Sequence, residues 1–384
     1  LTLPPLSLYI HVPWCVQKCP YCDFNSHKLK NNIPEKEYVA HLLDDLQIDA
    51  HFAQGRKLTS IFFGGGTPSL LSEQAISAII KGCEQIIGFE DNIEITLEAN
   101  PGTLEYNKFE GFARAGVNRI SIGVQSFQQD KLTKLGRIHD PEQAKSAAKY
   151  AADSVNTFNI DLMHGLPNQT LKDALTDLKQ AIELNPTHLS WYQLTIEPNT
   201  QFHSKPPKLP QDEVLWDIQQ QGHELLKAAG YHQYEISAYS KSTEHQCRHN
   251  LNYWRFGDYL GIGCGAHGKI TSIENNQFTI IRTEKVKHPK GYMDLTKPYL
   301  NKKWQVEQEE LPFEYFINRL RLREPFCLTD FEKVIGEASI SVVNAIGEAV
   351  NKGLLQEIEL NSQTHYQVTN KGIAFYNNLV DLFL

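Results

Sequence analysis

Three cysteines stand within eight residues near the start of the chain, as Cys15, Cys19 and Cys22 of the segment HVPWCVQKCPYCDFNSH. Thiolates are soft ligands, and cysteines this close together in a loop suit zinc or an iron–sulfur cluster. We favour a [4Fe–4S] cluster held by three cysteines, which leaves one iron open to a further ligand. Two alternatives stay open at this point: a redox-active dithiol in Cys19-Pro20-Tyr21-Cys22, and a closed zinc site. The zinc site needs a fourth ligand, for which the candidates are His11, Asp23 and His27.

Other residues that could do chemistry stand at the carboxyl ends of predicted strands. Short β-rich runs cover residues 8–12, 60–63, 93–98, 119–124, 157–163 and 188–194. The residues at their ends are the cysteine loop, the glycine-rich stretch 64–67, Glu98, Gln125 and Asp161. In parallel α/β folds the active site lies at the carboxyl ends of the strands, so we expect these residues to converge.

Helical periodicity separates these strands. Val39, Leu42, Leu43 and Leu46 recur at helical spacing. A second such stretch, 171–178, follows Thr170 and Asp173, which have the spacing of a capping box. Strands that alternate with helices imply a parallel sheet, because each crossover needs a helix. Right-handed crossovers can roll such a sheet into a full or partial barrel.

The remainder of the chain has a different pattern. A helix is predicted over 213–229, and 231–303 is irregular and rich in aromatics and glycine, as if to extend the barrel and cover one side of its mouth. Helices at 313–322 and 340–350, a hairpin at 355–360 and 365–368, and a helix at 372–382 resemble a winged helix. We therefore expect three units: 1–230, 231–303 and 304–384.

The composition argues against several classes of protein. The 384 residues carry a net charge of −8, which argues against nucleic acid as a partner, and acids also outnumber bases in the winged unit. No apolar run is long enough for an integral membrane segment, and no secretion signal opens the chain. We expect a cytoplasmic protein, with peripheral membrane contact left open. Seven cysteines do not suggest a disulfide scaffold, and Cys83 and Cys327 look like buried apolar residues.

The cysteine spacing resembles that of the radical S-adenosylmethionine (SAM) superfamily. Further segments resemble the branch that contains oxygen-independent coproporphyrinogen III oxidase (HemN) and the heme chaperone HemW. They are IFFGGGTPS at 61–69, EANP at 98–101, GVNRISIGVQSF at 116–127, LGR at 135–137 and NIDLMHGLP at 159–167. The resemblance covers nearly the whole chain and implies an α/β fold: a partial (β/α)6 TIM-like radical SAM barrel with a C-terminal α+β winged-helix-like domain.

This resemblance implies cofactors and their ligands. Cys15, Cys19 and Cys22 would bind the cluster, whose open iron would take the amino and carboxylate groups of SAM. SAM would further contact Gly65, Gly66 and Thr67 through its methionine part, Glu98 through its ammonium and Arg137 through its carboxylate. Gln125 and Asp161 would bind its ribose or polar ends, Tyr21 would lie over its adenine and Tyr9 near its sulfonium. No catalytic residue is assigned.

A second block separates the two activities of this branch. Residues 248–255, RHNLNYWR, contain the HNxxYW motif typical of HemW. Imidazole is a common axial ligand of heme iron, so His249 is the candidate heme ligand, with Cys247 as a weaker one. Tyr253 and Trp254 offer flat surface for a macrocycle, and Arg248 and Arg255 could pair with propionates. The alternative is that this block has only a structural role and packs at a joint between domains.

Two departures from the oxidase point the same way. The oxidase has a further cysteine two residues after the third cluster ligand, where this chain has Phe24, and it normally has a longer segment before its first strand. We therefore expect a carrier that passes heme to apo-hemoproteins of the respiratory chain, rather than an enzyme that decarboxylates coproporphyrinogen III in porphyrin biosynthesis. The resemblance also implies an electron donor such as flavodoxin or ferredoxin, and a homodimer is open to test.

Overall fold

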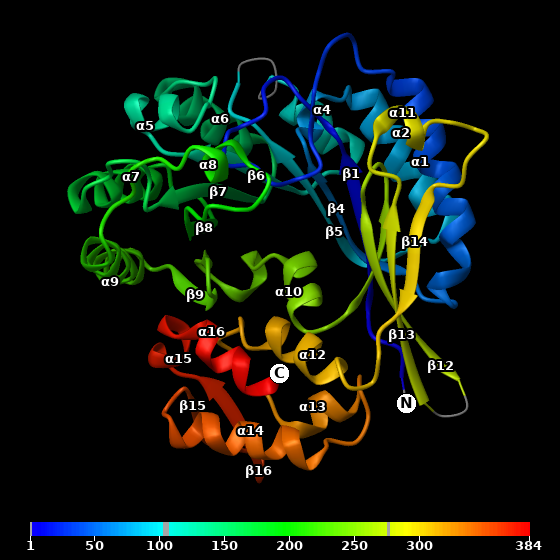
Figure 1. The fold of residues 1–384 in the computed structure, drawn as a ribbon. Coiled ribbons are helices and arrows are strands. Elements are labelled where there is room, and N and C mark those ends of the chain that lie inside the picture. Colours follow the sequence, from blue (N-terminus) through cyan, green and yellow to red (C-terminus); the bar gives the residue numbers. More distant parts are fainter. Residues whose placement is uncertain (1, 103–106, 275–276) are drawn as a thin grey trace.

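A twelve-stranded sheet runs through the computed structural model, which describes residues 2–102, 107–274 and 277–384. Within these residues the strand order is β14-β13-β12-β11-β1-β4-β5-β6-β7-β8-β10-β9 (Figure 1). The six central strands are parallel and confirm the six that the sequence predicts. They are β1 (Leu6–Val12), β4 (Leu58–Gly65), β5 (Phe89–Ala99), β6 (Arg119–Gln125), β7 (Thr157–His164) and β8 (His188–Gln193). β14 and β9 end the order without pairing to each other, so the sheet is open within the described residues, which agrees with the predicted partial barrel.

Helices connect the parallel strands and cover one face of the sheet (Figure 1). The capping pair is confirmed: the Thr170 hydroxyl accepts from the Asp173 N–H, and the Asp173 carboxylate accepts from the Thr170 N–H. Cys83 lies on a buried apolar stripe with Ile76, Ile79 and Ile80, as predicted. The connecting helices are α1 (Glu35–Asp49), α2 (Glu73–Ile86), α4 (Phe109–Ala115), α5 (Gln129–Lys134), α6 (Pro141–Ser154), α7 (Leu171–Glu183), α8 (Gln201–Ser204) and α9 (Asp212–Ala228).

The opposite, inner face of the parallel strands is polar. Successive strand residues point to opposite faces, so the apolar residues of β1 enter the core while Ser7, Tyr9 and His11 face inward. Hydrogen bonds run between strands on this face: the Ser60 hydroxyl donates to the Ser7 hydroxyl at 2.8 Å, and the Asn159 amide to the Ser121 hydroxyl at 2.8 Å. A polar inner face suits a ligand site, because it offers hydrogen-bond partners that a packed apolar core lacks.

The segment 231–303 extends the sheet, although its sequence pattern is irregular. β11 (Asp258–Ile262) pairs in parallel with β1, and β12 (His267–Glu274), β13 (Gln277–Lys285) and β14 (Leu300–Gln305) follow antiparallel. At the other end, β10 (Ala238–Ser240) and β9 (His232–Glu235) pair antiparallel beside β8. Two short helices, α10 (Arg248–Trp254) and α11 (Pro289–Tyr292), complete the segment. Polar residues interrupt the period-two alternation of apolar residues that identifies a strand in sequence, as in β14, whose sequence is LNKKWQ.

The C-terminal residues form a second hydrophobic cluster, which includes Phe316, Ile346 and Leu379 and is joined by Phe256 and Ile280 of the preceding segment. Cys327 is buried, as predicted. The elements are α12 (Leu311–Arg319), α13 (Leu328–Glu332), α14 (Ile340–Asn351), the hairpin of β15 (Leu355–Leu360) and β16 (Gln363–Val368), α15 (Asn370–Ala374) and α16 (Tyr376–Val380). The single helix predicted over 372–382 is broken, because Phe375 leaves helical geometry with φ −112° and ψ 43°. No helix in the described parts of the chain has the length and hydropathy to cross a bilayer.

Candidate functional site

The residues predicted to converge do so at the carboxyl ends of the parallel strands. A cavity of about 310 Å³ lies there. Its walls include the three cysteines and most of the predicted ligands: Cys15, Cys19, Tyr21, Cys22, Gly65, Gly66, Thr67, Glu98, Gln125, Arg137 and Asp161. Tyr9 and His249 are not among the described residues that line it. Tyr9 lies one layer deeper, where its hydroxyl is 3.1 Å from His11 Nδ1.

The cysteine loop is closed at its base by the short parallel pair β2 (Trp14–Cys15) and β3 (His27–Lys28). Each thiol has a polar neighbour: the Thr67 hydroxyl lies 3.5 Å from Cys15 Sγ, Arg137 Nη1 3.7 Å from Cys19 Sγ and the Ser26 hydroxyl 3.8 Å from Cys22 Sγ. Burial raises the pKa values of Cys15 and Cys22. These neighbours can donate to thiolates, so the loop suits a positively charged metal centre that displaces the thiol protons.

The alternatives for the loop find less support in the local contacts. His11 uses both ring nitrogens inside the protein, with Nε2 2.8 Å from the Asn25 carbonyl oxygen. His27 Nε2 lies 3.2 Å from the Lys287 carbonyl oxygen, and Asp23 is exposed. Within the described ranges no three His, Cys, Asp or Glu side chains surround one common ion position. A cubane does not require that arrangement, because each thiolate binds a different iron.

The glycine-rich end of β4 packs directly on the cysteine loop. Gly65 has φ +107°, a conformation that favours glycine. A Cβ atom on Gly66 would lie 2.5 Å from the Trp14 carbonyl oxygen and 2.7 Å from that of Val12. The Gly66 N–H also donates to the Val12 carbonyl at 2.7 Å. Gly66 is therefore needed to seat the cysteine loop itself, in addition to any contact with a ligand.

Two carboxyl groups line the cavity, Glu98 from β5 and Asp161 from β7, the strands on either side of β6. Burial raises the pKa of Glu98 to about 8, and the nearby Asp161 carboxylate adds to this increase. Burial also raises the pKa of Asp161, which accepts hydrogen bonds from Asn159 at 2.7 Å and Ser121 at 3.1 Å. A bound ammonium group would stabilise the ionised forms of both carboxyl groups and lower their pKa values. The pair therefore suits a cationic ligand.

Arg137 and Gln125 are tied to residues that the sequence analysis did not single out. Arg137 Nη2 donates at 2.6 Å to both the Asn100 side chain and the Gly123 carbonyl. Gln125 accepts from the Tyr192 hydroxyl at 2.9 Å. Asn100 lies in the EANP segment, so its role could have been predicted from that motif. Tyr192, at the end of β8, belongs to none of the motifs, so its role could not. Arg137 thus links the cysteine loop to the inner face of β6.

The predicted heme ligand His249 lies at the opposite ends of the strands from the cysteine loop. It is on α10, its side chain is 8% exposed, and its Nδ1 is 3.0 Å from the Ser60 hydroxyl. Its ring lies 5.0 Å from that of Phe62. Burial lowers the pKa of His249 to about 3, with a further decrease from Arg119, so the imidazole is neutral at physiological pH. In this conformation α10 closes the base of the barrel.

The residues around His249 join the barrel to the C-terminal unit. Arg255 forms a two-pronged ion pair with Glu324, at 2.8 and 2.5 Å. The Arg321 guanidinium lies 4.4 Å from the Trp254 ring centroid. Burial raises the pKa of Cys247 to about 12, which disfavours a thiolate ligand there. In this conformation the segment RHNLNYWR therefore packs at the joint between the barrel and the C-terminal unit. Arg255 is paired with a carboxylate of the protein itself.

Comparisons with known proteins show the family and the fold. The Radical SAM superfamily profile matches residues 9–181, and the HemN C-terminal domain profile matches 306–375. A protein named heme chaperone HemW from Escherichia coli (strain K12) is 56% identical over 383 residues, which is 100% of this chain and 99% of the relative. The heme chaperone HemW of Haemophilus influenzae is also 56% identical, over 100% of this chain and 98% of its own length. The structure of E. coli coproporphyrinogen III oxidase (HemN) has the same fold, with TM-score 0.81, 23% identity, and coverage of 99% of this chain and 90% of the oxidase.

Proposed function

Since the chain belongs to the heme chaperone HemW family of the radical SAM superfamily, we propose that it binds heme and delivers it to apo-hemoproteins such as respiratory cytochromes. One observation carries the proposal: relatives named heme chaperone HemW are 56% identical along the full length of this chain. Delivery is binding and release rather than turnover, so the chain needs a heme site that can open, beside the site built on the cysteine loop.

The cysteine loop would hold a [4Fe–4S] cluster through Cys15, Cys19 and Cys22. When bound, the cluster and SAM supply one-electron chemistry, and the protein supplies position and electrostatics. Thr67, Arg137 and Ser26 are placed to donate to the sulfur atoms. The sulfur-directed donors support this assignment, because hydrogen bonds to cluster sulfurs stabilise the bound form.

SAM would lie in the cavity between the cysteine loop and the strand ends. Glu98 and Asp161 would face its cationic groups, and Arg137 its carboxylate, through whichever guanidinium N–H groups Asn100 and Gly123 leave free. The remaining proposed contacts are Gly65, Gly66, Thr67, Gln125 and Tyr21, which line the cavity, and Tyr9 beneath it. All of these contacts remain predictions.

His249 remains a proposed heme ligand, but only in a conformation that differs from the one described. Its ring is buried against Phe62 and bonded to Ser60, so iron could reach it only after α10 moves away from the base of the barrel. A helix of seven residues has little stability of its own, so α10 can move when the contacts that hold it are broken.

One preparation tests the proposal and its main rival. The protein is reconstituted without oxygen, and iron, sulfide and heme are quantified on the same sample. We expect about four iron and four sulfide per chain, as the cluster type requires, and binding of added heme. The Cys15→Ala/Cys19→Ala/Cys22→Ala variant should lose the cluster, while the control Cys83→Ala, at a buried cysteine far from the loop, should keep it.

The rival function is oxidative decarboxylation of coproporphyrinogen III. The same reconstituted sample is given that substrate and SAM. Formation of vinyl groups at enzymatic rates would overturn the carrier proposal, and binding of heme without this reaction supports it. An electron donor such as flavodoxin or ferredoxin and a homodimer are further predictions, for which reduction assays and light scattering are the tests.

A further inference from the structure

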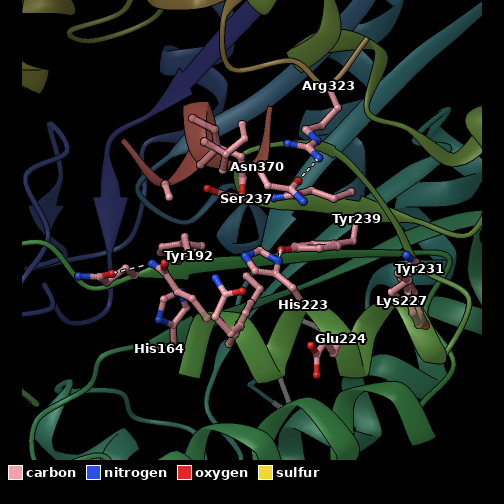
Figure 2. A pocket seen from close by; sticks show the side chains of 18 of the residues that line it. His164, Tyr192, His223, Glu224, Lys227, Tyr231, Ser237, Tyr239, Arg323 and Asn370 are labelled. Atoms are coloured by element: carbon pink, nitrogen blue, oxygen red, sulfur yellow. Dashed lines mark hydrogen bonds between the residues drawn. The ribbon is translucent and has the colours of Figure 1, made fainter. Parts of the chain in front are cut away.

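A second and larger cavity, of about 710 Å³, lies beside the last strands of the sheet. Figure 2 shows it between α9, the β8–β10 edge and the C-terminal unit, which contributes Asn370. We call it the edge cleft. Tyr192 lines both this cleft and the cavity at the cysteine loop, so the two are neighbours. The volume falls within the range of pockets that hold cofactors and other small molecules.

The edge cleft contains a guanidinium group without an anionic partner. Arg323 Nη2 donates to the Asn370 side chain at 2.6 Å, but Nη1 is buried and has no hydrogen-bond partner in the described residues. No carboxylate within the described ranges forms an ion pair with Arg323, whereas the neighbouring Arg321 pairs with Glu235 at 3.3 Å. Leaving a partly buried cation uncompensated is costly, which points to an anionic group on a ligand.

Three histidines line the same cleft, His164, His223 and the exposed His232, and Figure 2 labels the first two. His223 Nδ1 is hydrogen-bonded to the Tyr239 hydroxyl, which holds the ring and leaves Nε2 for another partner. A histidine ligand of a metal commonly has its other ring nitrogen fixed in this way. Burial and Arg323 both lower the pKa of His223, so its imidazole is neutral at physiological pH and has a lone pair to offer.

His164 gives an independent sign of an absent partner. Its side chain is 4% exposed, its ring lies 4.3 Å from that of Trp191, and its Nδ1 is buried with no hydrogen-bond partner in the described residues. Buried polar atoms are almost always paired, so an unpaired one beside a cavity suggests that a ligand or water supplies the partner. Together with Trp191 and Tyr239, these rings give the cleft an aromatic floor, while glutamine, lysine and arginine side chains make the rest of its lining polar.

We propose that the edge cleft is a heme-binding site, in which His223 Nε2 ligates the iron and Arg323 pairs with a propionate. The proposal rests on the function proposed above and adds the place where heme is held. A flat macrocycle with two carboxylates and a metal matches the aromatic floor, the unpaired guanidinium and the neutral imidazole. This site needs no movement of α10, in contrast to His249.

Heme titrations of the full chain, followed by absorption spectra, test the proposal. The variants are His223→Ala, Arg323→Gln and His249→Ala, and His203→Ala serves as the control because His203 is an exposed histidine on α8 outside the cleft. We expect His223→Ala to change the heme spectrum and to weaken binding at least about tenfold, with imidazole in the buffer restoring the spectrum. Arg323→Gln should weaken binding about tenfold while leaving the spectrum unchanged, since it removes a charge-assisted hydrogen bond but no iron ligand.

The outcomes separate this proposal from the proposed function. Wild-type binding with unchanged affinity and spectrum in both His223→Ala and Arg323→Gln, and loss only in His249→Ala, would overturn the edge cleft and keep the heme carrier. Failure of the wild-type chain to bind heme would overturn the carrier function itself.

Iron-free protoporphyrin provides a second comparison: it should bind wild type and His223→Ala equally, because it needs Arg323 but no axial ligand. A His223→Ala variant that loses both heme and protoporphyrin through misfolding is identified by circular dichroism, and Arg323→Gln then decides the question.

Discussion

Glu98 is the residue whose titration most directly reports on the cavity at the cysteine loop. Burial and Asp161 raise its pKa to about 8, above the ordinary value for glutamate of 4.5. The folded protein without ligand therefore binds a proton that the unfolded chain has lost at neutral pH. The stability that this proton contributes is fully present below about pH 4.5 and is lost as the pH rises through about 8.

The first prediction follows from this loss of stability as the pH rises. In chemical denaturation of the ligand-free protein, the free energy of unfolding should decrease between about pH 5 and pH 8, and Glu98→Gln should reduce that decrease. Glu90→Gln, at an exposed position on the same strand, is the control and should retain the wild-type slope. Equal slopes in wild type and Glu98→Gln would show that Glu98 is not buried as described.

A second prediction concerns Gly66, where close packing against the cysteine loop leaves no room for a side chain. Gly66→Ala should displace the loop and cost roughly 1–3 kcal/mol of stability, as overpacking commonly does, with loss of iron after reconstitution. Gly347→Ala is the control, because nothing lies within 4 Å of its would-be Cβ atom on α14. A Gly66→Ala protein that retains iron and stability would contradict the packing role given to this glycine.

At the scale of elements, α10 depends on one carboxylate. Glu94 of β5 accepts from the backbone N–H groups of Arg248 and His249, each at 2.9 Å, and so caps the helix. Our third prediction is that Glu94→Ala loosens α10 by about 1–2 kcal/mol, seen as faster amide hydrogen exchange in this helix. Glu90→Ala should leave exchange there unchanged. If α10 must open for iron to reach His249, Glu94→Ala should also speed heme binding through that residue.

The added strands are fastened to the barrel by buried charges. Lys285 of β13 contacts Asp45 at 2.5 Å and Asp49 at 2.7 Å, both on α1, and the three side chains are almost fully buried. The fourth prediction is that Lys285→Met costs about 3–5 kcal/mol in urea denaturation, because two carboxylates lose their cation. Lys297→Met, at an exposed pair with Asp294, should change stability by less than about 1 kcal/mol. Equal effects would contradict a structural role for the buried cluster.

The elements that sequence could predict are those with a clear local pattern. The six parallel strands and the capping box at Thr170 follow from periodicity and cap chemistry, and the structure confirms them. The strands β11–β14 are obscured by their polar residues. Pairing of β11 with β1, and of each following strand with the one before it, rather than local propensity, makes them strands.

At the scale of the whole molecule, the candidate site at the cysteine loop could be predicted because its residues lie in motifs at strand ends. The state of His249 could not, because its burial depends on Ser60 and Phe62, almost two hundred residues away in sequence. The partner of Arg255, Glu324, and the edge cleft around His223 also arise only from contacts between distant segments. Motifs identify the chemistry of a site, whereas long-range packing decides which groups are accessible.

The two cavities give the molecule a simple overall plan. One, at the cysteine loop, suits a cluster and SAM, and the other, at the sheet edge, suits a flat anion, with Tyr192 between them. The C-terminal unit closes one side of the edge cleft through Asn370 (Figure 2). Heme held there would lie beside the SAM cavity and at a surface from which another protein could receive it.

Cys15, Cys19 and Cys22 are proposed to hold a [4Fe–4S] cluster with one iron open to SAM, and the proposed function of the molecule depends on this cluster. Mössbauer spectroscopy of the oxygen-free protein, reconstituted with ⁵⁷Fe, tests this most directly, with and without SAM. We predict the spectrum of a cubane cluster in which one iron site changes when SAM is added, and the loss of that spectrum in the triple cysteine variant. Adventitious iron alone, or a spectrum that is the same in the wild type and in the triple variant, would contradict the account.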